Sequence, residues 1–215
     1  MIGTGRAFTA TAALCVMLAA AFGLPVGPAQ AQNIIDQWAS VKTPPAPELR
    51  PVTVDPKTTA LLMLDFMNET CGQRPPCVAT IPAVKKLLDE ARDAKATVIY
   101  SIIANSTPAR IIKDVAPTAD EQFVQAGPDK FLGTDLEKIL KDKDIETVIV
   151  TGTASNGAVL FTAAGAAFRG IKVIVPVDGM SAADPYADLT TAYTLANAPL
   201  ISTKSTLTTI DMIKF

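Results

Sequence analysis

Three groups of residues in this 215-residue chain have the types and the setting for chemistry. Asp65 closes the apolar run of residues 58–66, where a carboxylate is partly desolvated and suited to acid/base catalysis; the alternative is that it caps the next loop. The loop GTASNGA, residues 152–158, offers backbone N–H groups at a helix start that could bind an oxyanion, although most helix starts bind nothing. Lys130 is the third candidate, and its more ordinary role is that of a solvated surface lysine.

The glycines of this loop fit neither of two common phosphate-binding patterns. Gly152 and Gly157 have P-loop spacing, but Ala158 and Val159 follow where Lys and Ser or Thr are required. The third glycine of a dinucleotide fingerprint is also missing. We expect no cofactor.

Histidine is absent from the chain, which excludes several classes of active site. Ser-His-Asp triads and Cys-His pairs cannot form, and neither can His-ligated zinc, non-haem iron or blue copper sites. Any general acid or base must be Asp, Glu, Lys, Tyr or Cys, and we expect no metal. The net charge of −2 lacks the strong positive field typical of nucleic-acid binding, so we expect no nucleic-acid partner.

Residues 1–31 have the three regions of a secretory signal. Arg6 supplies the positive charge, residues 7–24 are almost wholly apolar, and Ala29-Gln30-Ala31 is a small-x-small cleavage pattern. The pattern predicts cleavage after Ala31 and a periplasmic or secreted protein without membrane attachment. The alternative is an uncleaved anchor, for which the apolar run is barely long enough.

Two cysteines remain once Cys15 leaves with the signal, and both lie in the turn-rich segment CGQRPPC. In an oxidising compartment we expect Cys71 and Cys77 to form a disulfide, the alternative being two free thiols. Zinc would need two further soft ligands. If reduced, Cys71 could act as a nucleophile near Asp65, which oxidation would prevent.

The order of elements predicts the architecture. A Pro-rich extended arm, residues 32–57, leads into one domain, residues 58–215. Strands are predicted at 58–66, 96–104, 122–125, 145–151, 171–177 and 200–203, four of them as long runs buried on both faces. Helices are predicted at 80–94 with Thr80 as N-cap, at 134–141 from a capping box, at 156–169 ended by Gly170, and from the Asp184 cap to 196. This alternation predicts a three-layer α/β/α sandwich with a mostly parallel sheet, and ligands of such sheets bind beyond the carboxyl ends of the strands.

Four segments together resemble the isochorismatase-like, or cysteine hydrolase, superfamily over residues 58–183. They are LLMLDF, GTDLEKIL, TVIVTGTASNGAVLFTAAGAAFRG and VIVPVDGMSA, of which the third is the most specific. The resemblance implies a Rossmann-like fold and hydrolysis of a small molecule, in a superfamily that includes amidases, nicotinamidases and isochorismatase. Many members use an Asp, a Lys and a Cys, with an oxyanion hole of backbone amides beside the Cys.

Carried over residue by residue, the resemblance places the family Asp on Asp65 and the family Cys on Ala158. Ser155, Asn156 and Gly157 would then form the oxyanion and substrate loop. If FLGT (131–134) fixes the register, the family Lys falls near residues 125–126, and Lys130 can serve only if its loop is rearranged.

Two functions follow from the resemblance. The first is an isochorismatase-like hydrolase with Asp65 as acid/base, Lys130 as its charge partner and no thiol nucleophile. Isochorismatase-type members cleave a vinyl ether in this way, with a small residue in place of the Cys, since the reaction needs one positioned acid. The alternative is a pseudoenzyme that binds a small ligand or a protein partner. Analogy with the family also suggests a homo-oligomer.

Overall fold

The computed structural model describes residues 33–215, which divide after Pro44 into two units that are taken separately. In the first, Asn33 caps the short helix α1 (Ile34–Gln37) by accepting a hydrogen bond from the backbone N–H of Ile35, and a 3-10 turn follows. The predicted signal and its cleavage after Ala31 lie outside the described residues. Within residues 33–215, no helix combines the length and the apolar character needed to cross a membrane.

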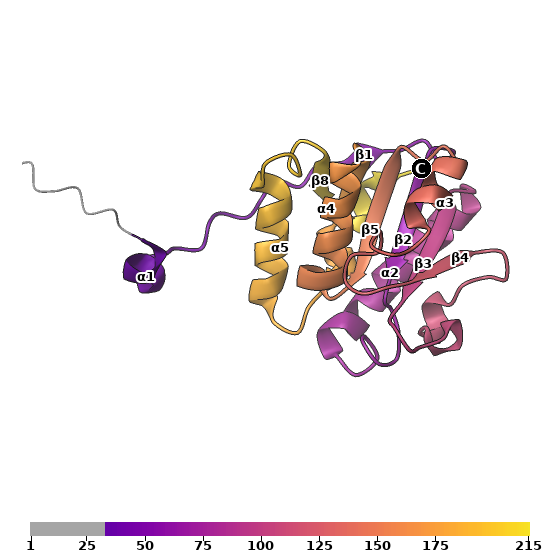
Figure 1. Cartoon of the computed structure of the whole chain (residues 1–215), viewed down its shortest axis with the longest axis horizontal. Coiled ribbons are helices and arrows are strands. Elements are labelled where there is room, and N and C mark those ends of the chain that lie inside the picture. The colour runs from indigo at the N-terminus through magenta and orange to yellow at the C-terminus, as the bar shows by residue number, and fades with distance from the viewer. Residues whose placement is uncertain (1–32) are drawn as a thin grey trace, which may run out of the picture. The chain divides into compact units, whose positions relative to one another are not determined.

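Residues 45–215 fold around a parallel sheet, as the alternation of elements predicts (Figure 1). From one edge to the other the strands are β4 (Gln122–Gln125), β3 (Thr97–Ile102), β2 (Thr59–Leu64), β5 (Thr147–Thr153), β6 (Lys172–Pro176) and β8 (Ser205–Thr208), with β7 (Met180–Ser181) paired to the end of β5. The central strands β2 and β5 are buried along their whole length, which explains their continuous apolar runs.

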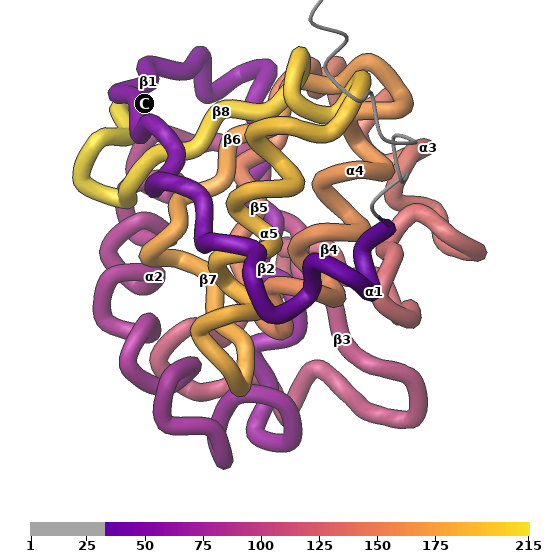
Figure 2. The backbone as a smooth tube through the Cα atoms, turned by 90° about the vertical axis from the view of Figure 1, so that its left-hand side faces the viewer, coloured from indigo at the N-terminus to yellow at the C-terminus, as the bar shows by residue number. Residues whose placement is uncertain are grey.

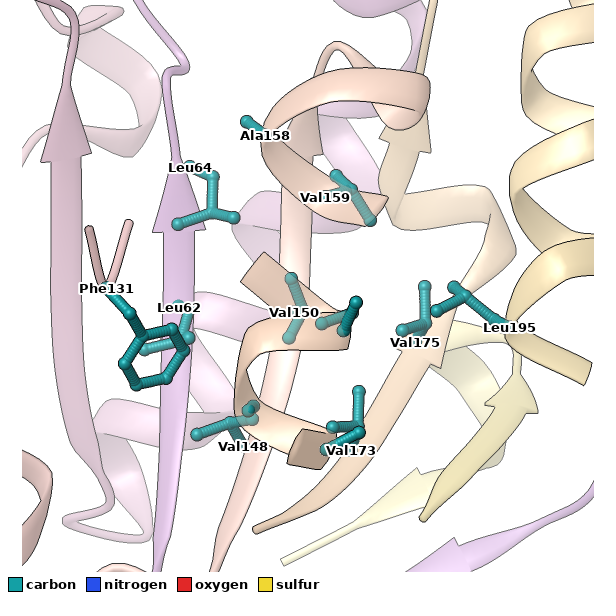
Figure 3. Packing of buried hydrophobic residues seen from close by; sticks show 14 of the residues in the cluster. Leu62, Leu64, Phe131, Val148, Val150, Ala158, Val159, Val173, Val175 and Leu195 are labelled. Atoms are coloured by element: carbon teal, nitrogen blue, oxygen red, sulfur yellow. The ribbon is translucent and has the colours of Figure 1, made fainter. Parts of the chain in front are cut away.

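Helices cover both faces of this sheet, which confirms the three-layer α/β/α sandwich (Figure 2). Helix α2 (Pro75–Asp93) packs on one face against the odd-numbered residues of β2. The opposite face is covered by α3 (Leu136–Asp142), α4 (Leu160–Phe168) and α5 (Pro185–Asn197). There, the even-numbered residues Leu62 and Leu64 of β2 join Val148, Val150 and the valines of β6 in one apolar cluster (Figure 3).

The predicted helix of residues 80–94 begins earlier than the sequence pattern indicates. Its first positions are Pro75 and Pro76, which suit a helix start because the first N–H groups have no partner there. Thr80 therefore lies inside α2 and donates its hydroxyl hydrogen to the Cys77 carbonyl instead of capping the helix. Pro82 is an interior residue of this helix.

Other helix boundaries follow the predicted caps more closely. Gly170 ends the run after α4 with a φ of +81°, and Asp184 caps α5 by accepting from the Tyr186 N–H at 2.8 Å. Only half of the capping box before α3 forms. The Thr134 hydroxyl accepts from the Leu136 N–H, while Glu137 pairs with Lys141 and Arg169.

One predicted strand forms a turn instead, and part of the predicted arm pairs with the end of the chain. Residues 200–203 make a turn, because Leu200 is exposed and has a left-handed φ of +66°, and the strand begins only at Ser205. Within the predicted arm, β1 (Val52–Thr53) pairs in parallel with β9 (Ile213–Lys214), so this part of the chain belongs to the compact unit.

Candidate active site

Asp65 and Lys130 form a buried ion pair at the carboxyl edge of the sheet. The Lys130 Nζ donates to Asp65 Oδ2 at 2.6 Å, and the Ser101 hydroxyl of β3 donates to Asp65 Oδ1 at 2.7 Å. Lys130 has no exposed surface and Asp65 is 5% exposed, which rules out a solvated surface lysine. Withdrawing two charges from water costs on the order of several kcal/mol each, which pairing and further hydrogen bonds offset in part. Both Asp65 oxygens accept a hydrogen bond, and the Lys130 ammonium donates to Asp65 and to the Gly127 carbonyl.

The backbone fixes Asp65 as firmly as its side chain does. Its φ is +53°, a left-handed conformation that Asp tolerates better than most residues. The Asp65 N–H donates to the Ser101 carbonyl at 3.3 Å, and the Thr70 hydroxyl donates to the Asp65 carbonyl. The carboxylate is therefore held in one orientation by the strand before it and the loop after it.

Lys130 reaches Asp65 because the loop between β4 and α3 folds back over the strand ends. Its backbone N–H donates to the Thr162 hydroxyl of α4 at 3.2 Å, and its Nζ also donates to the Gly127 carbonyl at 2.9 Å. Phe131 next to it is buried in the apolar cluster of Figure 3. The rearranged loop thus brings in Lys130, whereas Gln125, near the family register, bonds the carbonyls of residues 103 and 106.

Gly152 lets β5 come close to the end of β2. It stands opposite Leu64 in the parallel register, and a Cβ added to it would lie 2.4 Å from the Leu64 carbonyl oxygen. Its φ of +144° is also one that only glycine adopts readily. The register ends at this pair, so Asp65 follows it directly after β2 and Thr153 is the last residue of β5.

The predicted oxyanion loop forms a π-helical turn, Ser155–Val159, that leads into α4. Ser155 and Ala158 are buried, but Asn156 is exposed. The Gly157 N–H already donates to the Ala154 carbonyl at 3.0 Å, so it is not free for an oxyanion. The Ser155 hydroxyl is buried without a partner in the described part of the chain, and such a group costs about 1–3 kcal/mol unless something bonds it.

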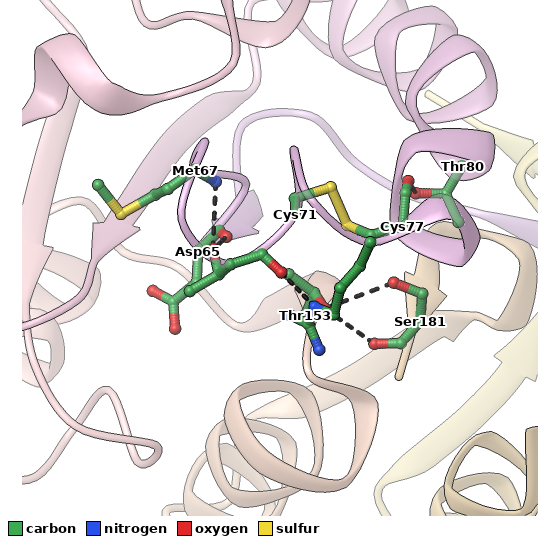
Figure 4. Close-up of a disulfide and its surroundings, with 9 residues drawn as sticks. Asp65, Met67, Cys71, Cys77, Thr80, Thr153 and Ser181 are labelled. Carbon is green, nitrogen blue, oxygen red and sulfur yellow. Dashed lines mark hydrogen bonds between the residues drawn. A yellow bond between two sulfur atoms is a disulfide. The ribbon is translucent and has the colours of Figure 1, made fainter. Parts of the chain in front are cut away.

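The predicted disulfide is confirmed. Cys71 and Cys77 are joined with their Cα atoms 5.2 Å apart, and Figure 4 shows the bond beside Asp65 and Thr153. Arg74, inside this loop, donates from Nη2 to the Thr153 hydroxyl at 2.8 Å and from Nε to a backbone carbonyl. Because Cys71 is oxidised and buried, it presents no thiolate.

Sequence reasoning missed two polar residues of this edge. Ser101 is the hydroxyl within the apolar stretch VIYSII, a pattern that could have marked it as the partner of another buried polar group. Arg74 is the single charged residue between the two cysteines, but only the fold brings it to Thr153, 79 positions away.

The chain matches the isochorismatase domain over residues 59–205, which is most of its length. An isochorismatase-like hydrolase from Alkaliphilus metalliredigens is 25% identical with a TM-score of 0.65, covering 72% of this chain and 95% of the other. None of the curated proteins matches significantly.

Two more distant structures share the fold. A cysteine hydrolase from Pseudomonas syringae pv. phaseolicola is 21% identical with a TM-score of 0.66, covering 77% of this chain and 94% of its own. An N-carbamoylsarcosine amidase from Thermoplasma acidophilum is 22% identical with a TM-score of 0.63, covering 72% and 97%.

Proposed function

The chain belongs to the isochorismatase family, and from this premise we propose that it hydrolyses a small molecule with Asp65 as the proton-transferring group. One observation carries the proposal: the 2.6 Å contact between Asp65 and Lys130, both buried, at the carboxyl end of the central strand β2. Parallel sheets bind their ligands at this edge, and a carboxylate held there against desolvation is suited to acid/base chemistry.

Ala158 decides which nucleophile is available. It is buried in the turn before α4, where the resemblance puts the family thiol, and a methyl group cannot attack. The nearby Ser155 hydroxyl has no hydrogen-bonded base among the described residues to activate it. Water is therefore the nucleophile, and no covalent intermediate forms at residue 158.

Vinyl-ether hydrolysis needs only these groups. The step starts once the Asp65 carboxylate has taken up a proton from the solvent. Asp65 gives this proton to the enol carbon, which leaves an oxocarbenium ion and a carboxylate that the Lys130 ammonium stabilises. Water adds to the cation and returns a proton to Asp65, and the resulting hemiketal breaks into a carbonyl compound and an alcohol. The Ser155 hydroxyl can bond a polar group of the bound molecule.

A second function, binding without catalysis, is favoured by the same Ala158. A chain that retains the Asp–Lys pair but lacks the family nucleophile keeps a polar, buried binding region even if no bond is broken. Hydrolysis and binding without catalysis are distinguished by whether the bound molecule is converted to product.

The test compares two Asp variants on a panel of small vinyl ethers, amides and esters. Asp65→Asn should lower any native hydrolysis by about 10²–10⁴-fold, the usual contribution of a positioned acid or base. Asp142→Asn is the matched control, because Asp142 pairs with Lys138 on the exposed side of α3 and should leave the rate unchanged. A native protein that turns over nothing on the panel supports the binding function. Equal rates for both variants would refute the role of Asp65.

A further inference from the structure

Arg74 occupies a position where an arginine is unfavourable for the helix that follows it. It is the N-cap of the 19-residue helix α2, a place that favours Ser, Thr, Asp or Asn, and its side chain makes no capping hydrogen bond. Its positive charge also stands at the positive end of the helix dipole. Residues that break local rules in this way are typical of functional sites.

The charge of Arg74 has no counter-charge among residues 33–215. Glu69, on the same loop, pairs with Arg110 at 2.5 Å, and Asp65 pairs with Lys130 at 2.6 Å. No described carboxylate forms an ion pair with Arg74, although its side chain is partly buried. A half-buried guanidinium without a carboxylate attracts an anion.

The guanidinium of Arg74 is fixed on one side and open on the other. Nε donates to the Thr70 carbonyl and Nη2 donates to the Thr153 hydroxyl at 2.8 Å. Within the described chain, Nη1 has no hydrogen-bond partner, so three N–H groups remain, and one on Nη1 with the second on Nη2 forms a planar pair of donors. That pair matches the two oxygens of a carboxylate.

The contact with Thr153 brings Arg74 to the candidate active site. Thr153 follows Gly152, which stands opposite Leu64, the residue before Asp65. Two positions further on, the Ser155 hydroxyl is buried without a partner among the described residues. The Cys71–Cys77 bond closes the loop on both sides of Arg74 and limits where it can move.

We propose that Arg74 binds a carboxylate of the molecule on which Asp65 acts. The inference rests on the proposed function and adds to it a substrate class, a small carboxylic acid. A carboxylate fits better than a phosphate, because phosphate sites at helix starts use backbone N–H groups, and Pro75 and Pro76 have none to offer.

The experiment measures binding of benzoate and of its neutral counterpart benzamide by calorimetry. Native protein should bind benzoate at least about tenfold more tightly than benzamide, since a charge-assisted pair contributes that much. Arg74→Gln should weaken benzoate binding by about tenfold or more, and Arg74→Lys by less, because the ammonium lacks the planar fork. Arg110→Gln is the matched control: it removes a neighbouring arginine that already has its own carboxylate, and benzoate affinity should not change.

Three results would overturn the proposal: no binding of benzoate to native protein, equal affinity for benzamide, or unchanged benzoate affinity in Arg74→Gln. Tighter binding of inorganic phosphate than of benzoate would overturn the choice of a carboxylate. If Arg74→Gln does not fold, the Arg74 Nε resonance of the native protein must shift with benzoate and not with benzamide. The native protein separates the two proposals: benzoate binding that depends on Arg74, in a native protein that hydrolyses no compound of the panel, would leave the anion site standing and refute the hydrolase.

Discussion

The amino and carboxyl edges of the parallel sheet differ in how far their charged side chains are exposed. At the amino edge, a groove of about 720 Å³ lies between the first residues of β2, β5, β6 and β8. Its charged side chains are all exposed: Asp55, Glu146, Lys172 and Lys204. At the carboxyl edge, Asp65 and Lys130 contact each other with almost no exposure.

The volume of a groove therefore does not by itself identify a functional site. Charges in water cost the fold nothing, so those of the amino edge need no function to explain them. A buried ion pair is weak evidence for stability, because desolvation often exceeds the attraction between the charges. The carboxyl edge carries this desolvation cost. It also holds Asp65 in a left-handed backbone conformation and, within the described residues, a Ser155 hydroxyl without a hydrogen-bond partner. Such a concentration of unfavourable features indicates a function.

The largest expected difference between the edges comes from removing one lysine at each. Lys130→Met leaves the Asp65 carboxylate buried without its cation and should lower the free energy of unfolding by about 3–5 kcal/mol. Lys172→Met at the amino edge should change it by no more than about 0.5 kcal/mol. Urea unfolding measures both. Adding Asp65→Asn to Lys130→Met should recover part of the loss, and equal small losses at both edges would break the comparison.

A second pair of variants tests glycines. Gly152→Ala at the carboxyl edge would bring a Cβ within 2.4 Å of the Leu64 carbonyl and should destabilise by about 3 kcal/mol. Gly170→Ala, beside the amino edge, meets no atom within 4 Å and should cost about 1 kcal/mol for its positive φ alone. Thermal unfolding of the two proteins should reproduce this order, and the reverse order would show that β5 can move away from β2.

The Cys71–Cys77 disulfide closes a loop at the carboxyl edge of the sheet. Replacing Cys71 and Cys77 together by Ala should lower the free energy of unfolding by about 2 kcal/mol, the chain-entropy value for so short a loop. Native protein unfolded in reductant should lose a similar amount. If neither treatment changes the urea midpoint, the bond does not constrain the unfolded chain, and the loop around Arg74 is held by its hydrogen bonds alone.

The smallest effect is expected at Glu137, which borders a second hollow near the amino edge. Hydrogen bonds from Lys141 and Arg169 lower the pKa of its exposed carboxyl from 4.5 to about 2. Because the folded-state pKa is depressed, the stabilisation is complete above pH 4.5 and is lost as the pH falls towards 2. The stability difference between native protein and Glu137→Gln should shrink over that range and also in high salt, where exposed charges are screened. A difference that is independent of pH would contradict it.

Most of the fold could be predicted from local pattern. Apolar runs of strand length bounded by turn residues located the central strands, and the Asp184 and Gly170 signals located helix ends. The missed start of α2 shows the limit of this reasoning. Two prolines inside the cysteine loop indicate a turn, although they suit the first residues of a helix equally well, and tertiary packing decides between the two.

The site was less predictable, because its contacts join distant segments. Asp65 follows from the pattern of a single strand, but Lys130 meets it only because the intervening loop is anchored by Thr162 and Phe131. No local sequence pattern indicates that the Arg74 side chain hydrogen-bonds to the Thr153 hydroxyl. Burial of a charge depends on what covers it, and the cation that pairs with Asp65 lies 65 positions further along the chain.

The strand order also has a consequence for how the protein reaches its native state. Within residues 33–215 all paired strands are parallel. The central strand β2 pairs with β3, which begins at Thr97, and with β5, which begins at Thr147. A topology built from such distant pairings folds in milliseconds to seconds, not microseconds. Until β3 and β5 dock, the uncharged segment TALLML has two open hydrogen-bonding edges, and it is there that newly made chains are most prone to associate with one another.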